Sequence, residues 1–157
     1  MVPQGKRSCY MPLKRLKEKL HEIAPLVFEG TPVLFAYLYG SYAAELPHPF
    51  SDLDIGIFVE QSALKDCLSL ELSLALRTDE LLGHVVQSDV RAVNHLPLLI
   101  TGRILTDGEL IYSRAEDERI GFETQVRMAY FDFLAVSQQY QKAYRAGLLG
   151  TVGHGVG

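Results

Sequence analysis

The chain has 157 residues, 48% of them hydrophobic and 22% charged, which is the composition of one globular domain with a single core. Its net charge of -4 argues against direct nucleic-acid binding, because that binding depends on clustered Lys and Arg. Two distant cysteines, Cys9 and Cys67, favour reduced thiols in a cytoplasm over a zinc site or a disulfide. The sequence shows no run of membrane-spanning length and no signal-peptide layout, so no membrane association is expected.

The first 32 residues predict an irregular start followed by one amphipathic helix. Residues 1–10 are polar, and Pro12 suits the first turn of a helix. The apolar positions of that helix fall on one face: Leu13, Leu16, Leu20 and Ile23. The basic run at residues 14–19 alternates with leucines and is best explained as the solvated face of the helix. Pro25 and the turn at residues 30–32 are expected to separate it from the next element.

Residues 33–39 predict a buried strand that ends at a phosphate-binding turn. The run is continuous, apolar and rich in aromatic residues, and Gly40 ends it. If residues 42–46 open a short helix, Ser41 is its N-cap and the exposed N–H groups form an anion site. Gly40 would let a phosphate approach the backbone. His48 follows in the loop; it either lines the nucleotide pocket or, more simply, is an ordinary loop histidine.

A pair of carboxylates opens the second predicted strand, residues 52–59. Because successive strand side chains alternate, Asp52 and Asp54 share one face, roughly 6.5–7 Å apart at Cα. Carboxylates that close raise each other's proton affinity unless a cation compensates, and Mg²⁺ is the usual compensating ion. The alternative is a plain Gly-Ser turn and a solvated acidic strand end.

The middle of the chain predicts a helix, a strand and a hairpin. Residues 62–82 favour a long helix ending at Gly83; its leucines occupy more than one stripe, so it is buried on two sides or serves an interface. Residues 84–93 alternate as a strand. Residues 94–101 predict a short helix or loop, and residues 102–112 a hairpin or strand-turn-strand that turns at Asp107-Gly108.

The end of the chain predicts one long helix from Ser113 or Arg114 to about Arg145. Its apolar stripe is either core or, given its aromatic side chains, a partner-binding surface. The stripe comprises Ile120, Val126, Tyr130, Phe133, Leu134, Val136, Tyr140 and Tyr144. The domain is therefore expected to span residues 1–146, and the glycine-rich residues 147–157 to form a flexible tail.

The pattern Gly40-Ser41, ten residues, then Asp52-Leu53-Asp54 resembles the signature of the DNA-polymerase-β-like nucleotidyltransferase superfamily. The segment GSYAAELPHPFSDLDIGIFV is most similar to the minimal nucleotidyltransferases, in particular the MntA-type antitoxins encoded with a HEPN-domain toxin. The predicted elements and the resemblance together imply an α/β (α+β) fold, with a small mixed sheet, flanking helices and a long C-terminal helix.

In that superfamily a third carboxylate comes from a neighbouring strand. Asp89 fits its distance along the chain and the strand phase, whereas Asp79 and Glu80 lie at a helix end. The alternative is that Asp89 is a plain surface residue. Arg91, two positions on, either pairs with Asp89 or contacts phosphate.

The resemblance implies transfer of a nucleoside monophosphate from a triphosphate, ATP by analogy, to a hydroxyl. Asp52 and Asp54 would bind two Mg²⁺ ions, Asp89 would ligate one and help deprotonate the acceptor, and Gly40-Ser41 would hold the terminal phosphates. MntA-like proteins adenylylate a tyrosine of their HEPN ribonuclease toxin, so we expect an AMPylating antitoxin with that partner. The alternatives are small-molecule nucleotidyl transfer, usually served by an extra helical domain, and neutralisation by binding alone.

Overall fold

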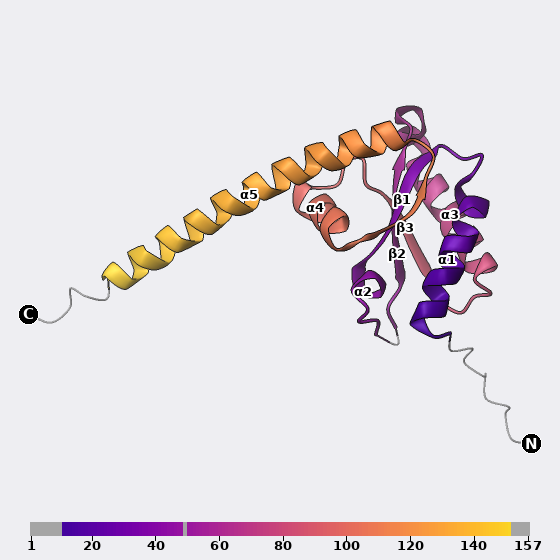
Figure 1. Cartoon of the computed structure of the whole chain (residues 1–157), viewed down its shortest axis with the longest axis horizontal. Helices are drawn as coiled ribbons and strands as arrows, with labels where there is room; N and C mark the ends of the chain where they lie inside the picture. The colour runs from indigo at the N-terminus through magenta and orange to yellow at the C-terminus, as the bar shows by residue number, and fades with distance from the viewer. Residues whose placement is uncertain (1–10, 49, 152–157) are drawn as a thin grey trace, which may run out of the picture.

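A four-stranded mixed sheet forms the centre of the molecule (Figure 1). The computed structural model describes residues 11–48 and 50–151. The strands lie in the order β3-β2-β1-β4; β1 is antiparallel to both neighbours, and β2 is parallel to β3. They comprise β1 (Val33–Tyr39), β2 (Leu53–Val59), β3 (Ser88–Ala92) and β4 (Glu109–Ser113). This order places β3 at one edge of the sheet, beside β2, the strand that follows Asp52.

The two faces of the sheet carry two separate cores. Two helices pack on the face that contains Ile55 and Ile57: α1 (Leu13–Phe28) and α3 (Cys67–Leu81). A short 3₁₀ helix, η1 (Gln61–Asp66), precedes α3. The opposite face, with Phe35 and Tyr37, packs against α4 (Leu98–Asp107) and the start of α5 (Glu116–Thr151). Figure 1 shows α1 and α3 on one side of the strands and α4 and α5 on the other. The predicted fold class is confirmed.

The first helix was predicted to end before Pro25. In the structure α1 continues through this proline to Phe28. Proline inside a helix costs about 3 kcal/mol or more, chiefly through a lost hydrogen bond. Here Val27 and Phe28, each 1% exposed, offset that loss by packing in the core. The Glu29 N–H then donates to the Pro25 carbonyl at 2.9 Å and closes the last turn.

The predicted hairpin at residues 102–112 is wrong in its first half. Ile104 and Leu105 lie in α4 rather than in a strand, and with Thr101 they form one buried helical face. Gly102 permits this packing, because a Cβ there would lie 2.3 Å from the ring of Tyr130 on α5. The second half is confirmed as β4, which pairs with β1.

Three other predicted boundaries also change. The strand predicted from residue 84 begins only at Ser88, because Gly83 and His84 both have positive φ and form a turn. The helix predicted at residues 62–82 is divided into η1 and α3. The long helix continues through Gly147 to Thr151, so the predicted tail cannot begin at residue 147. The predictions for residues 1–10, which include Cys9, and for residues 152–157 lie outside the described residues.

The outer part of α5 makes little contact with the domain and projects away from it (Figure 1). Of the predicted apolar stripe, Tyr130 is buried, whereas Val136, Tyr140 and Tyr144 are 66%, 74% and 62% exposed. This stripe is therefore not core along its length. Within the described residues, none of the helices has the length and apolar character needed to cross a membrane.

A partly buried hydrogen bond joins the start of α5 to the sheet. The Tyr37 hydroxyl donates to Glu123 Oε1 at 2.7 Å, and Arg119 Nη1 donates to the same carboxylate oxygen at 2.7 Å. Burial and the Glu123 carboxylate raise the pKa of Tyr37, so it remains a neutral donor. The network explains how a mostly exposed helix keeps one fixed orientation at its first turns.

Replacing Tyr37 with Phe is expected to lower the free energy of unfolding by about 1 kcal/mol, the usual worth of one hydrogen bond. Glu123 keeps its Arg119 partner, so no charge is left unpaired. Urea unfolding measures the change. Tyr144→Phe is the matched control at an exposed position, and equal stabilities for the two variants would contradict the prediction.

Candidate active site

Gly40 forms the turn that joins β1 to the site. Its φ is +70°, and a Cβ at this position would lie 2.3 Å from Asp54 Oδ2. Glycine is therefore required twice, once for the left-handed backbone and once for the space that the carboxylate occupies. The sharp turn brings the chain directly off the strand end and over the neighbouring strand.

The predicted helix at residues 42–46 with Ser41 as its N-cap is wrong. The observed helix α2 (Gly40–Ala43) is a single turn that begins at Gly40, with Tyr39 at the N-cap position and no side-chain cap. The observed helix therefore begins two residues before Tyr42, where a helix capped by Ser41 would begin. A helix of one turn has little macrodipole, so the bare backbone at Gly40 is the feature that remains open to an anion.

Asp54 and Asp89 are neighbours across the parallel pair β2 and β3. The register pairs Asp54 with Asp89 on one side and with Tyr39 of β1 on the other. Burial, then the negative charges of Asp89 and Asp52, raise the pKa of Asp54, with Arg91 opposing them. Asp52 is exposed, one residue before β2 begins. Asp54 is therefore repelled by the charges of two other carboxylates, and a cation would relieve this repulsion.

Arg91 pairs with Asp89, which is one of the two alternatives predicted for this arginine. Arg91 Nε donates to Asp89 Oδ2 at 3.0 Å, and both side chains are more than one third exposed. The ion pair orients one oxygen of Asp89 and leaves the other without this contact. His48 is exposed, and its ring Nδ1 accepts a hydrogen bond from the Phe50 N–H at 3.3 Å, as an ordinary loop histidine does.

Two residues near the carboxylates were missed by sequence reasoning. Tyr39 lies over Gly56, with its ring 3.6 Å from where a Cβ would be, and burial followed by the charge of Asp54 raises its pKa. Glu71 on α3 accepts the Ala92 N–H at 2.7 Å, which satisfies an N–H of the edge strand β3. The position of Tyr39 directly before Gly40 was a usable signal. Nothing in the sequence pointed to Glu71.

The donors suit a hard cation in chemical kind, because Mg²⁺ prefers carboxylate oxygens. They do not form a complete coordination site: within residues 11–48 and 50–151, no group of three or more His, Cys, Asp or Glu side chains is arranged to hold a metal. The exposure of Asp52 and the pairing of Asp89 with Arg91 account for this. The residues therefore fit the ion in type, and binding would have to bring them closer.

Comparison with known proteins identifies the fold and its class. Residues 21–117 match the family model described as Polymerase beta, Nucleotidyltransferase. The chain belongs to this nucleotidyltransferase family, as its motif predicted. A search of curated proteins finds no significant match.

Two of the solved structures similar to this chain come from toxin–antitoxin complexes. A chain from a toxin–antitoxin complex with AMP-PNP is 19% identical, with a TM-score of 0.52; the match covers 85% of this chain and 97% of that one. A complex of tri-AMPylated Shewanella oneidensis HEPN toxin with MNT antitoxin contains a chain that is 15% identical, with a TM-score of 0.49, covering 90% and 98%. The first of these matches supports the shared fold.

Replacing Gly40 with Ala is expected to destabilise the protein by about 1–2 kcal/mol and to lower nucleotidyl transfer about tenfold or more. The new methyl group would displace the Asp54 carboxylate as well as strain the backbone. Thermal unfolding and a transfer assay measure the two effects. Gly30→Ala is the matched control, because Gly30 has φ +74° but open space around its Cβ position. Equal activity in both variants would contradict the prediction.

Proposed function

We propose that this chain transfers AMP from ATP to a tyrosine hydroxyl of a partner HEPN ribonuclease toxin and thereby acts as its antitoxin. The observation that carries the proposal is the register pairing of Asp54 with Asp89 beside the Gly40 turn. Carboxylates on adjacent strands next to an open glycine backbone suit a metal-bound nucleoside triphosphate.

Each residue of the site has a role in this proposal. Asp52 and Asp54 would hold two Mg²⁺ ions together with Asp89, and Gly40-Ser41 would bind the terminal phosphates. The ions would neutralise phosphate charge and lower the pKa of the attacking hydroxyl. The hydroxyl oxygen bonds to the α-phosphorus, the bond from that phosphorus to the bridging oxygen breaks, and pyrophosphate leaves. Asp89 accepts the hydroxyl proton, while Arg91 keeps its carboxylate oriented.

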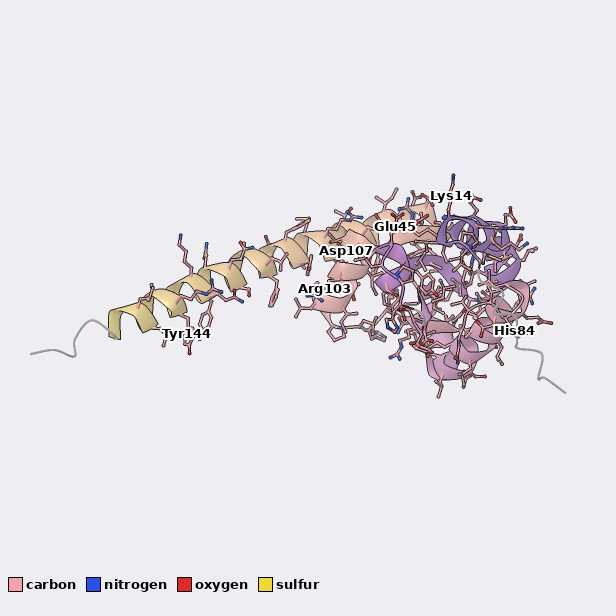
Figure 2. The ribbon with its side chains drawn as sticks, turned by 90° about the horizontal axis from the view of Figure 1, so that it is seen from below. Lys14, Glu45, His84, Arg103, Asp107 and Tyr144 are labelled. Atoms are coloured by element: carbon pink, nitrogen blue, oxygen red, sulfur yellow. The ribbon has the colours of Figure 1, made fainter. Side chains whose placement is uncertain are left out.

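A protein acceptor is supported by the exposed surface of α5. Phe133, Val136, Tyr140 and Tyr144 are all more than 40% exposed, and Figure 2 shows Tyr144 on the part of the helix that projects from the domain. Aromatic residues are enriched in protein interfaces, and a group of exposed apolar side chains on one projecting helix is typical of a binding surface. This surface favours a macromolecular acceptor over a small molecule. The shared fold with a chain from a toxin–antitoxin complex with AMP-PNP points the same way.

The test incubates the purified chain with ATP labelled at its α-phosphate, Mg²⁺ and a HEPN protein chosen as the candidate partner. Label on a tyrosine of the HEPN protein, lost with Asp52→Ala, is the expected result. Labelling of a small molecule instead would favour the small-molecule alternative. An Asp52→Ala variant that still neutralised the toxin in cells would favour neutralisation by binding alone.

A double variant, Tyr140→Ala with Tyr144→Ala, tests the role of α5. It should weaken binding of the HEPN protein and leave ATP binding unchanged. Calorimetry measures both affinities. Unchanged affinity for the HEPN protein would show that the acceptor binds elsewhere on the domain.

A further inference from the structure

A cavity beside the Gly40 turn has no role in the account above. It has a volume of about 340 Å³ and lies where the short helix α2 meets α4. Figure 2 shows Arg103 and Asp107 on α4, next to the segment that carries Glu45. The residues that line it and matter below are Tyr39, Gly40, Ile100, Arg103 and Asp107.

Arg103 is the notable side chain of this cavity, because nothing neutralises it. Within residues 11–48 and 50–151 its guanidinium makes no hydrogen bond or ion pair, and its side chain is exposed. Asp107 follows one turn later on the same helix, but the two are not within ion-pair distance. Arg91 by contrast is committed to Asp89 at 3.0 Å. Arg103 is thus a cation available for a ligand.

The cavity adjoins the carboxylate site through two shared residues. Gly40 belongs to both, since it lines the cavity and lies against Asp54 Oδ2. Tyr39 also belongs to both, as a lining residue and as the register partner of Asp54. A triphosphate whose reacting phosphate lies at the carboxylates can therefore extend past Gly40 into the cavity. Its terminal phosphates, which carry most of its charge, would then lie next to α4.

We infer that Arg103 is a specificity residue that binds the terminal phosphates of the nucleotide, so that the site distinguishes ATP from AMP. The inference deepens and rests on the proposed function. Guanidinium presents a fixed fork of N–H donors that matches phosphate oxygens, and it remains charged at all physiological pH values. The helix α4 that carries Arg103 is fixed on the domain: Gly102 lies against Tyr130, and Arg127 Nη2 donates to the Leu105 carbonyl at 3.0 Å.

The test measures binding of ATP, AMP and inorganic triphosphate to the full chain by calorimetry with Mg²⁺. Arg103→Gln should weaken ATP and triphosphate binding about 10- to 100-fold, the loss of a charged hydrogen bond, and leave AMP binding unchanged. Arg103→Lys should recover part of the affinity. Asp107→Asn should bind ATP as tightly or more tightly, a change of opposite sign that separates charge recognition from loss of packing.

The control is Arg77→Gln, which removes the same charge from an exposed position on α3 and should change no affinity. Equal weakening of ATP and AMP by Arg103→Gln would overturn the inference in favour of a contact with the base or ribose. Unchanged ATP affinity would overturn it while leaving the proposed function standing. A wild-type chain that binds no ATP would overturn both, and this outcome needs no acceptor protein to be seen.

Discussion

Replacing Asp54 with Asn is expected to lower AMP transfer roughly 100-fold or more while the protein remains folded. Asp54 lies between Tyr39 and Asp89 in the sheet and against Gly40, so it is the central carboxylate of the site. Asn keeps the shape but loses the charge that a metal ion needs. Initial rates with labelled ATP measure the effect.

Stability should move in the opposite direction to activity. The pKa of Asp54 is raised in the folded state by burial and by Asp89, so the ionised carboxylate disfavours folding at neutral pH. This penalty is absent below the unfolded value near 3.8 and is complete above the raised folded value. Asp54→Asn should therefore unfold at equal or higher urea concentration at pH 7 without metal.

The control for Asp54→Asn is Glu18→Gln, which removes one negative charge from an exposed position on α1. It should retain full activity. An Asp54→Asn variant with activity like that of the control would show that this carboxylate takes no part in the transfer.

Asp89→Asn is the second variant with a large expected effect, again a loss of roughly 100-fold or more in transfer. Its position beside Asp54 suits a residue that accepts the proton of the acceptor hydroxyl, and its pairing with Arg91 orients the carboxylate. Arg91→Gln should be milder, about tenfold, because Arg91 acts by orienting Asp89. The comparison uses the same assay, with urea unfolding to show that both variants fold.

The two variants separate a site carboxylate from a surface ion pair. If Asp89 and Arg91 form only a surface pair, both variants should keep nearly full activity, since exposed pairs contribute little. A loss confined to Arg91→Gln would indicate that Arg91 itself contacts the nucleotide.

Strand phase and glycine chemistry could be predicted from local sequence. Residues 33–39 form β1 with the predicted bounds, and the alternation after Asp52 gives β2 its buried side through Leu53 and Ile55. The first prediction depends on a continuous apolar run and the second on period-two alternation, and a sequence displays both patterns directly. The strand pairing of Asp54 with Asp89 could be expected only through the resemblance, because 35 residues separate them.

Other features depend on contacts between distant segments. Pro25 remains inside α1 because Val27 and Phe28 fill the core beyond it. Ile104 and Leu105 form a helix because Gly102 admits Tyr130 of α5. At Pro25 the local sequence favours the end of a helix, and before Asp107-Gly108 it favours a strand. In both places the packing of distant segments outweighs this local preference.

The sequence alone determined the family, the two strands of the motif and the carboxylates they carry, because motif spacing and side-chain alternation are local properties. Only the tertiary structure decided three other matters: that Arg91 pairs with Asp89, that Arg103 lines the cavity at Gly40 without a partner, and that the aromatic stripe of α5 is exposed. The physical reason is the same for all three. Whether a charge is paired or an apolar face is covered depends on what the fold places next to it, and those neighbours lie far away along the chain.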